Sequence, residues 1–216
     1  MAKERVAIIT ASVANFDNVA PVPQQTMPFD YFCVTKVYPP NFELLSNRML
    51  SKYPKVQGHK LFDNQILIWI DGRVKITSNK FVQYMVEKLE SSEIVGVKHP
   101  ERNDSYQELS FILRQMDGGD EYLLSRYDRK KIKGELDFIT KEELPRDYPL
   151  RNAGIYARWN NKKINDAFDE WWKLIIDNNQ EYDQVLYNYI CWKRELNVNE
   201  VVWDDNYFTV GSHKGE

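Results

Sequence analysis

The chain has 216 residues and a nearly balanced charge, with 29 basic and 32 acidic side chains and a formal net charge of −3. Its 43% hydrophobic content excludes a disordered chain, and its length predicts a single α/β-sized domain over residues 1–216. The acidic balance excludes a global field that attracts nucleic acid or an anionic membrane, and no stretch approaches the roughly 18 apolar residues of a membrane-spanning helix.

The N-terminus and the cysteines point to a reducing compartment. The first residues lack the apolar segment of a secretory signal peptide. Cys33 and Cys191 are far apart, and each lies in an apolar run, which suits buried thiols better than a disulfide framework. We therefore expect a soluble, cytoplasmic protein.

Short apolar runs predict buried strands in the first half of the chain. Residues 6–11, 31–35, 66–70 and 94–97 are rich in β-branched and aromatic side chains and are bounded by polar residues or proline. Residues 15–28 form a polar, proline-containing loop between the first two runs. A helix is expected over residues 43–52.

Helical periodicity dominates the rest of the chain. Residues 81–89 and 105–116 each carry an apolar stripe, and Ser105-x-x-Glu108 has the form of a capping box. The charged segment 118–144 predicts a helix followed by an exposed loop near Gly134. Two further helices are expected over 164–175 and 182–190, and short strands at 201–203 and 207–210 are expected to close the sheet.

This alternation of strands and helices predicts a mostly parallel sheet covered on both faces. Such sheets bind ligands beyond the carboxyl ends of their strands, and Asp71 follows the most apolar strand directly. A carboxylate at that position needs a cation or hydrogen-bond donors, and Mg²⁺ or Mn²⁺ bridging to a diphosphate is one solution. The alternative is a turn aspartate in an Asp-Gly hairpin.

Other polar residues are candidates with equally plain structural alternatives. Asp183 opens a helix and could simply cap it, and His99 could be structural. His213 and Lys214 could contact metal and phosphate or belong to an unstructured tail. A basic run with Tyr127 inside it is either a phosphate-tracking strip for DNA or a solvated helix face. This run consists of Arg126, Arg129, Lys130, Lys131 and Lys133.

Several motifs occur in a suggestive order. They are Asn15-Phe16-Asp17, Lys55-Val-Gln-Gly-His59-Lys60-Leu61-Phe62, Ile68-Trp69-Ile70-Asp71-Gly72, Lys98-His99-Pro100-x-Arg102, Tyr106-x-Glu108, Asn152-Ala-Gly154-Ile-Tyr-Ala-Arg158, Phe168-x-x-Trp171-Trp172 and Asp183-Gln184. Over roughly residues 6–194 the chain thereby resembles a glycosyltransferase-like family, long described as a domain of unknown function, with plant mucilage- and pectin-related, bacterial and viral members. More widely, it is similar to the glycogenin-like retaining transferases.

This resemblance implies a GT-A-like (Rossmann-like) fold, a nucleotide-sugar donor and a divalent metal, Mn²⁺ or Mg²⁺. It matches Asp71 to the last residue of the metal-binding Asp-x-Asp motif, whose first aspartate is replaced here by Trp69. It also matches Asp183 and Gln184 to an Asp-Gln pair near the sugar. By the same analogy, His213 would bind metal and Lys214 would bind the diphosphate.

The resulting hypothesis is a glycosyltransferase that moves a sugar to an acceptor hydroxyl on a glycan, a protein, a small molecule or a modified viral DNA base. Asp71 and His213 would hold the metal, and His99, Arg102, Asp183 and Gln184 would act at the reacting groups. The expected substrate-binding residues are Arg48, Lys60, Trp69, Asn152, Gly154 and Lys214. The alternatives are a non-catalytic sugar- or nucleotide-binding module and an amide hydrolase that acts on ceramide-like lipid.

Overall fold

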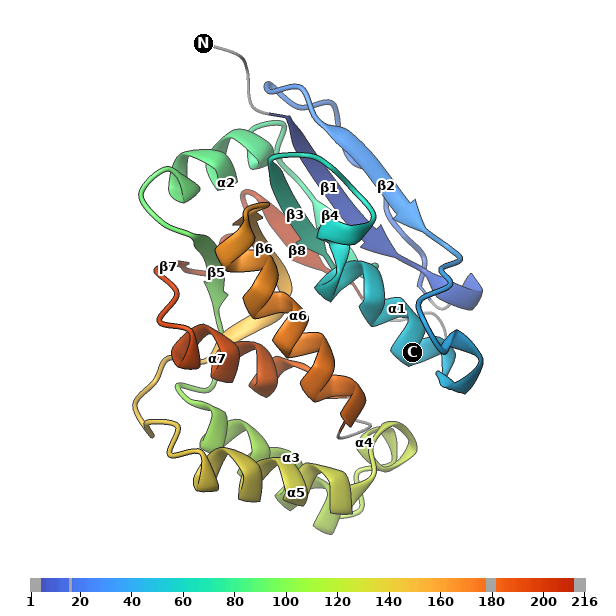
Figure 1. The fold of residues 1–216 in the computed structure, drawn as a ribbon, viewed down its shortest axis with the longest axis vertical. Helices are drawn as coiled ribbons and strands as arrows, with labels where there is room; N and C mark the ends of the chain where they lie inside the picture. Colours follow the sequence, from blue (N-terminus) through green and yellow to red (C-terminus); the bar gives the residue numbers. More distant parts are fainter. Residues whose placement is uncertain (1–4, 16, 178–181, 212–216) are drawn as a thin grey trace.

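The computed structural model of the protein describes residues 5–15, 17–177 and 182–211 (Figure 1). In chain order its elements are β1 (Val6–Ala11), β2 (Asp30–Val34), α1 (Asn47–Val56), β3 (Ile66–Ile70), β4 (Val74–Ile76), α2 (Phe81–Leu89), β5 (Ile94–Lys98), α3 (Ser105–Asp117), α4 (Glu121–Arg126), α5 (Arg129–Lys141), β6 (Arg151–Trp159), α6 (Lys162–Asp177), α7 (Gln184–Lys193), β7 (Val198–Val201) and β8 (Phe208–Val210). Short 3-10 helices precede and follow α1.

Within the described residues, six strands form the central sheet in the order β2-β1-β3-β6-β5-β7. Strand β1 pairs in parallel with β2 and β3, and β5 pairs in parallel with β7. Strand β6 lies between β3 and β5 and is antiparallel to both. The predicted α/β fold, with a mixed, mostly parallel sheet flanked by helices, is confirmed.

The apolar sequences of β1 and β3 follow from burial on both faces of the sheet. On one face, Ile9 and Trp69 belong to a core with α1, α6 and α7. On the other face, Ile8 and Ile68 pack into a core with α2 and the small sheet formed by β4 and β8. Because both faces are covered, polar groups can meet solvent or ligand only at the strand ends. In Figure 1, α1 and α6 cross the near face of the sheet.

A third apolar cluster joins α3 and α5, which lie together at the lower end of the molecule in Figure 1. Helix α5 runs through Gly134, so the expected exposed loop at that position is wrong. Its start is capped by Asp128, whose carboxylate accepts from the Lys130 amide, and its buried face carries Ile132 and Ile139. These helical contacts outweigh the low helix propensity of one glycine.

Strand β6 has no clear strand signature in the sequence, because Arg151, Asn152, Gly154 and Arg158 interrupt its apolar residues. The structure nevertheless places it in the middle of the sheet. By contrast, β2 is an edge strand, and Cys33 on it is exposed, so the expectation of two buried thiols holds only for Cys191.

Three local expectations are also corrected by the structure. The N-cap of α3 is Asp104, which accepts from the Gln107 amide, so Glu108 has no capping role. Strand β4 pairs with β8 and not with β3, which rules out the Asp-Gly hairpin at Asp71. For the same reason β8 does not close the central sheet, whereas β7 does.

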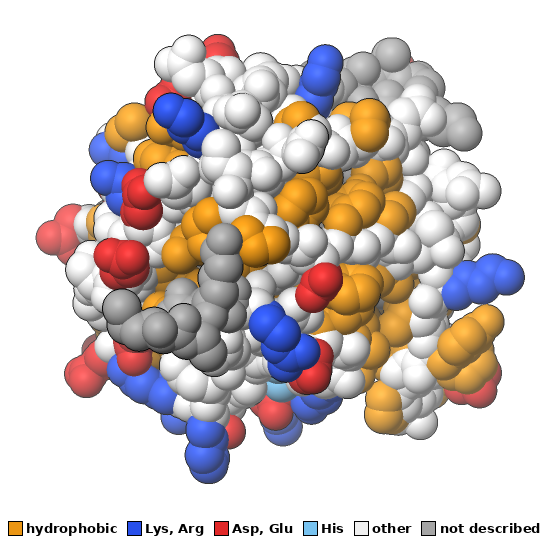
Figure 2. Space-filling view, turned by 90° about the horizontal axis from the view of Figure 1, so that it is seen from above, with side chains coloured by type: hydrophobic (Ala, Val, Ile, Leu, Met, Phe, Trp, Pro, Cys, Tyr) orange, Lys and Arg blue, Asp and Glu red, His pale blue; other side chains and the backbone are white. Residues whose placement is uncertain are grey.

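The surface agrees with the balanced charge of the sequence. Figure 2 shows acidic and basic side chains mainly around the periphery of one face, with hydrophobic groups nearer its centre. Both signs of charge occur there, so this face has no uniform field. None of the helices in the described part of the chain combines the length and apolar character that crossing a bilayer requires.

A buried polar cluster joins the segment after α1 to β6 and α6. The Arg158 guanidinium, 1% exposed, donates to Asn165 Oδ1 at 2.9 Å and lies 3.2 Å from His59 Nδ1. On its other side, His59 Nε2 lies 3.0 Å from Asp169, which also pairs with Lys60. A guanidinium can only donate, so Nδ1 accepts and Nε2 carries the proton of a neutral imidazole.

We expect the protein to lose stability as the pH falls from about 6.5 towards 4. Burial, with the neighbouring Arg158 charge, lowers the pKa of His59 from 6.5 to about 4. In this window the unfolded chain therefore binds a proton that the folded state excludes. Urea unfolding at several pH values should show a smaller loss for His59→Gln than for the wild type. Identical pH dependences in the two proteins would contradict this account.

Candidate functional site

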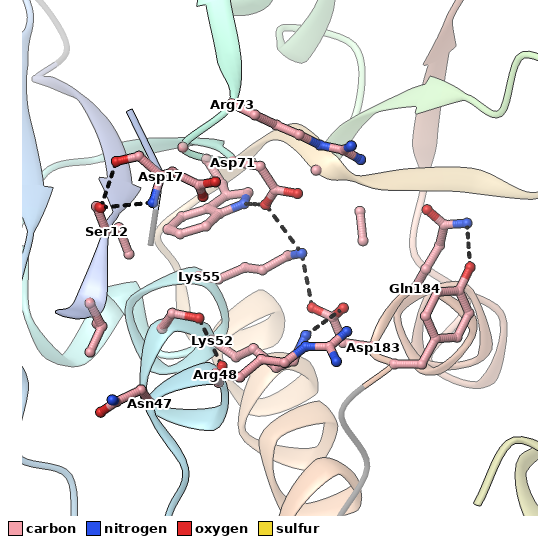
Figure 3. A pocket seen from close by; sticks show the side chains of 18 of the residues that line it. Ser12, Asp17, Asn47, Arg48, Lys52, Lys55, Asp71, Arg73, Asp183 and Gln184 are labelled. Carbon is pink, nitrogen blue, oxygen red and sulfur yellow. Dashed lines mark hydrogen bonds and ion pairs between the residues drawn. The ribbon is translucent and has the colours of Figure 1, made fainter. Parts of the chain in front are cut away.

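A cavity of about 310 Å³ lies at the carboxyl ends of β1 and β3, where the sheet geometry favours ligand binding. The start of β6, one face of α1 and the N-terminal end of α7 complete its walls. Figure 3 shows the side chains of Arg48, Lys55, Asp71 and Asp183 pointing toward a common space.

Asp71 stands at the end of β3, and its contacts to other described side chains are made through one carboxylate oxygen. Its Oδ1 accepts a hydrogen bond of 2.8 Å from Trp69 Nε1 and lies 3.5 Å from Lys55 Nζ. Its Oδ2 packs over Gly154, where an added Cβ would lie 2.8 Å from that oxygen. A glycine at position 154 is therefore needed to leave room for the carboxylate, whose side chain is 35% exposed.

The start of β6 reaches the cavity because its pairing with β5 is irregular. Gly96 pairs with Tyr156, but the next residue, Val97, pairs with Asn152. The extra residues on β6 form a bulge, a device that changes the direction of side chains next to many sites. Asn152 Oδ1 accepts from the Gly154 amide at 2.6 Å, which fixes this bulge beside Asp71.

A second carboxylate, Asp183, lies between two lysines of α1. Its oxygens are each 2.9 Å from an ammonium group, one from Lys52 and the other from Lys55. All three side chains are nearly buried, with exposures of 7–11%. Burial alone raises the pKa of Asp183, but the two lysines outweigh it and hold that pKa well below its usual value. The same carboxylate and Asp71 outweigh burial at Lys55 and raise its pKa.

Asp183 does not cap α7, since its side chain makes no hydrogen bond to the first turn of that helix. The helix is instead fixed by Asn188, one turn further on, which is fully buried. Its side chain donates to the carbonyl of Arg151 and accepts from the amide of Arg151, both at 2.9 Å. This paired contact attaches α7 to β6 and so holds Asp183 against the lysines.

Two arginines approach the cavity from opposite sides of the linked side chains of Asp71, Lys55 and Asp183 (Figure 3). Arg73, just before β4, extends from one side. Arg48, on the first turn of α1, extends from the other and lies 4.4 Å above the ring of Tyr127. It also donates to the carbonyl of Arg126, so the end of α4 forms part of the wall.

Glu108 lies behind the cavity and connects it to the Lys-His-Pro-x-Arg motif. Its carboxylate accepts from Arg102 Nε and from the Tyr182 hydroxyl, and Gln184 Nε2 lies 3.4 Å away. Tyr182 and Gln184 line the cavity, whereas Arg102 and His99 do not. Burial lowers the pKa of His99, whose Nδ1 accepts from the Arg102 amide at 3.1 Å.

The structure brings most of the candidate residues together. Seven of them line the cavity: Arg48, Trp69, Asp71, Asn152, Gly154, Asp183 and Gln184. Lys60 lies elsewhere and pairs with Asp169, and His99 and Arg102 reach the cavity only through Glu108. His213 and Lys214 lie outside the described residues. The basic run is divided, because Arg126 lines the cavity while Arg129 pairs with Asp117.

Sequence reasoning assigned no role to four residues that line the cavity, Lys52, Lys55, Arg73 and Tyr182. A signal for the lysines was present, because Arg48, Ser51, Lys52 and Lys55 follow the spacing of one helix face. No comparable pattern marks Arg73 or Tyr182.

The cavity carries an excess of positive charge suited to an anion. Its lining includes five cationic side chains and three carboxylates, a difference of two. The cations are Arg48, Lys52, Lys55, Arg73 and Arg126, and the carboxylates are Asp17, Asp71 and Asp183. Guanidinium and ammonium groups that converge in a concave site bind phosphate oxygens through charge-assisted hydrogen bonds.

Comparisons with known proteins find similarity among solved structures. No protein-family model and no curated protein matches the sequence. Among solved structures, the chain is similar to the crystal structure of a glycosyltransferase involved in the glycosylation of the major capsid of PBCV-1. The two share 11% sequence identity at a TM-score of 0.48, over 96% of this chain and 95% of the other. Because function depends on the residues of a site, the chemistry must follow from the cavity itself.

The buried charge cluster predicts a large effect of one isosteric substitution. Asp183→Asn leaves Lys52 and Lys55 buried without their shared countercharge, and we expect it to lower the free energy of unfolding by about 3–5 kcal/mol. The control is Asp166→Asn, which breaks the exposed pair with Lys162 and should cost less than about 1 kcal/mol. Urea unfolding measures both, and equal effects would show that the cluster contributes no special stability.

Proposed function

We propose that this protein is a glycosyltransferase that takes a sugar from a nucleotide diphosphate donor and joins it to an acceptor hydroxyl. The observation that carries the proposal is the cationic cavity at the carboxyl edge of the sheet, where Asp71 and Asp183 hold the lysines in place. A sugar nucleotide carries negative charge on both phosphates, which matches the positive excess of the lining. The resemblance of the motifs to a glycosyltransferase-like family agrees with this choice.

In the proposed reaction, the bond between the anomeric carbon and the diphosphate oxygen breaks, and the electron pair stays with the diphosphate. The acceptor oxygen forms the new bond to the anomeric carbon and gives its proton to water or to an oxygen of the departing diphosphate. Negative charge therefore grows on the leaving group, and fixed cations beside it lower the barrier. We assign this task to Arg48 and Arg73, which extend toward the cavity, and to Lys55, which lies between Asp71 and Asp183.

Asp183 acts in this proposal as a positioning residue. Its low pKa keeps it ionised, but both oxygens are occupied by ammonium groups, so it is poorly available as a base or nucleophile. Its effect is to keep Lys52 and Lys55 charged and correctly placed in a buried setting. Gln184 and Tyr182, held by Glu108, present polar groups at the opposite wall.

The described residues supply few ligands for a divalent metal. Among the described residues no group of three histidine, cysteine or acidic side chains could hold an ion. Asp71 Oδ2, for which Gly154 leaves space, could supply one ligand, and substrate phosphates and water would complete the shell, as is common for Mg²⁺. Bound in this manner, a metal would neutralise charge on the diphosphate. Asp71 would hold it, with His213 as a candidate outside the described residues.

The cavity lining also bears on the identity of the acceptor. Arg126 is the member of the basic run that reaches the cavity, so an acceptor with phosphates, including a DNA base, remains part of the proposal. For the alternative of an amide hydrolase, the described residues offer no group of three histidine, cysteine or acidic side chains that could hold a catalytic metal. A non-catalytic module would bind the donor without releasing the sugar.

Arg73 offers a direct test of the transferase. Incubation with a panel of nucleotide sugars should give slow sugar release, and Arg73→Gln should reduce kcat/KM by about tenfold to a hundredfold, since it removes one cation from the leaving group. Lys75→Gln, an exposed change on β4 outside the cavity lining, is the matched control and should leave the rate unchanged. Donor binding without any release would indicate a binding module, and equal rates in both variants would contradict the assigned role.

The metal prediction is synergy with the nucleotide. Because the protein offers few ligands of its own, Mn²⁺ should bind weakly alone and at least about tenfold more tightly with a nucleoside diphosphate, as electron paramagnetic resonance can measure. Asp71→Asn should abolish the increase. If Mn²⁺ bound equally well without nucleotide, the diphosphate would not share the metal. If Asp71→Asn had no effect, Asp71 would have no metal role. In either case the transferase proposal would still stand on the arginines and lysines.

A further inference from the structure

A second cavity, of about 440 Å³, lies along the outer side of α3 and shares no lining residue with the first. Three arginines line it, Arg102 before the helix, Arg114 in its last turn and Arg146 from the segment before β6. These residues are far apart in sequence, and the fold brings them to one groove.

Aromatic rings hold two of these arginines in place. The Arg146 guanidinium lies 4.4 Å above the ring of Tyr106, whose hydroxyl donates to the carbonyls of Ile139 and Leu144. Tyr106 is 7% exposed and thus forms a fixed floor. Stacking of a guanidinium on such a ring leaves its edge available for hydrogen bonds.

Arg102 is more firmly fixed than the other two. It lies 4.4 Å above the ring of Phe111, and its Nε, Nη1 and Nη2 contact Glu108, Glu101 and His99. A guanidinium has five N–H groups, so these three contacts leave two for a ligand. The Lys-His-Pro-x-Arg motif, which ends in Arg102, therefore contributes to the lining of the second cavity and not to that of the first.

Within the described part of the chain, Glu101 and Glu108 balance the charge of Arg102, but Arg114 and Arg146 have no carboxylate partner. The carboxylate in its lining belongs to Asp104, which is 7% exposed and caps α3. Among the described residues, Arg114 and Arg146 make no ion pair, although acidic residues outnumber basic ones in the chain. Arg114 and Arg146 thus line the groove without a paired carboxylate, and an oxyanion would supply their countercharge.

We infer that this groove is a second anion-binding site, which takes a phosphate or carboxylate group. Planar guanidinium groups match both oxyanions through paired hydrogen bonds, and Ser110 and Gln107 add polar groups to the wall. The inference is independent of the proposed transferase, because it uses no residue of the first cavity.

Nuclear magnetic resonance with ¹⁵N-labelled protein distinguishes the two cavities. Titration with inorganic phosphate should shift the amides of Gln107, Ser110 and Phe111 in the groove, separately from those of Gly72 and Gly154 in the first cavity. Titration with glucuronate tests binding of a carboxylate group, and titration with uncharged glucose is the control for both anions. In the double variant Arg114→Ala/Arg146→Ala, the anion affinity calculated from the groove shifts should be at least about tenfold weaker than in the wild type. The shifts of Gly72 and Gly154 should persist.

Lys130→Ala/Lys141→Ala removes the same charge from exposed positions on α5 and should leave the groove affinity unchanged. Equal weakening in the two double variants would show a general charge effect and overturn the inference. It also fails if neither anion shifts the groove amides of the wild type. Should the arginine double variant not fold, Arg114→Gln alone, at an exposed position, should still weaken binding, and an unchanged affinity would likewise overturn the inference.

Discussion

Two ammonium groups buried beside one carboxylate are the constraint on which the main cavity depends. Burial disfavours the charged forms of Lys52 and Lys55, and Asp183 between them opposes this effect on the pKa of both lysines. The carboxylate therefore fixes the distance between α1 and the start of α7. Asn188 fixes α7 to β6, and the Tyr156 hydroxyl donates to the Lys55 carbonyl, so the same arrangement is attached to the sheet at two further points.

The sheet determines which residues surround this charge cluster. Strand β3 is apolar on both faces, so Asp71 is placed where its carboxylate can leave the core. The reversed strand β6 brings its N-terminal end to the same edge, and its bulge places Asn152 and Gly154 beside that carboxylate. Parallel strands alone would bring only carboxyl ends to this edge. The antiparallel strand thus adds a small, polar wall that a glycine makes possible.

The fold class could be predicted from the sequence because short, continuous apolar runs indicate buried strands and periodic apolar stripes indicate amphipathic helices. Asp71 could be singled out because it ends a buried strand, whereas the role given to Asp183 came from the resemblance of the Asp-Gln motif, since its place at the start of a helix predicts only a cap. Strand β6 could not, because its central position is determined by partners far away in the chain. Glu108 resembled a capping residue, but Asp104 takes that role and leaves Glu108 to contact Tyr182. The local sequence pattern could not distinguish a carboxylate that caps a helix from one that contacts a distant side chain.

Helix α1 carries Arg48, Ser51, Lys52 and Lys55 on a single rigid element, and all four line the cavity. Successive residues of a helix are rotated by about 100° around its axis. Loss of a single residue between Arg48 and Lys52 would therefore turn the arginine away from the space that the lysines face, even if the helix itself survived. The site is consequently far more sensitive to changes of length in this helix than to many changes of side chain.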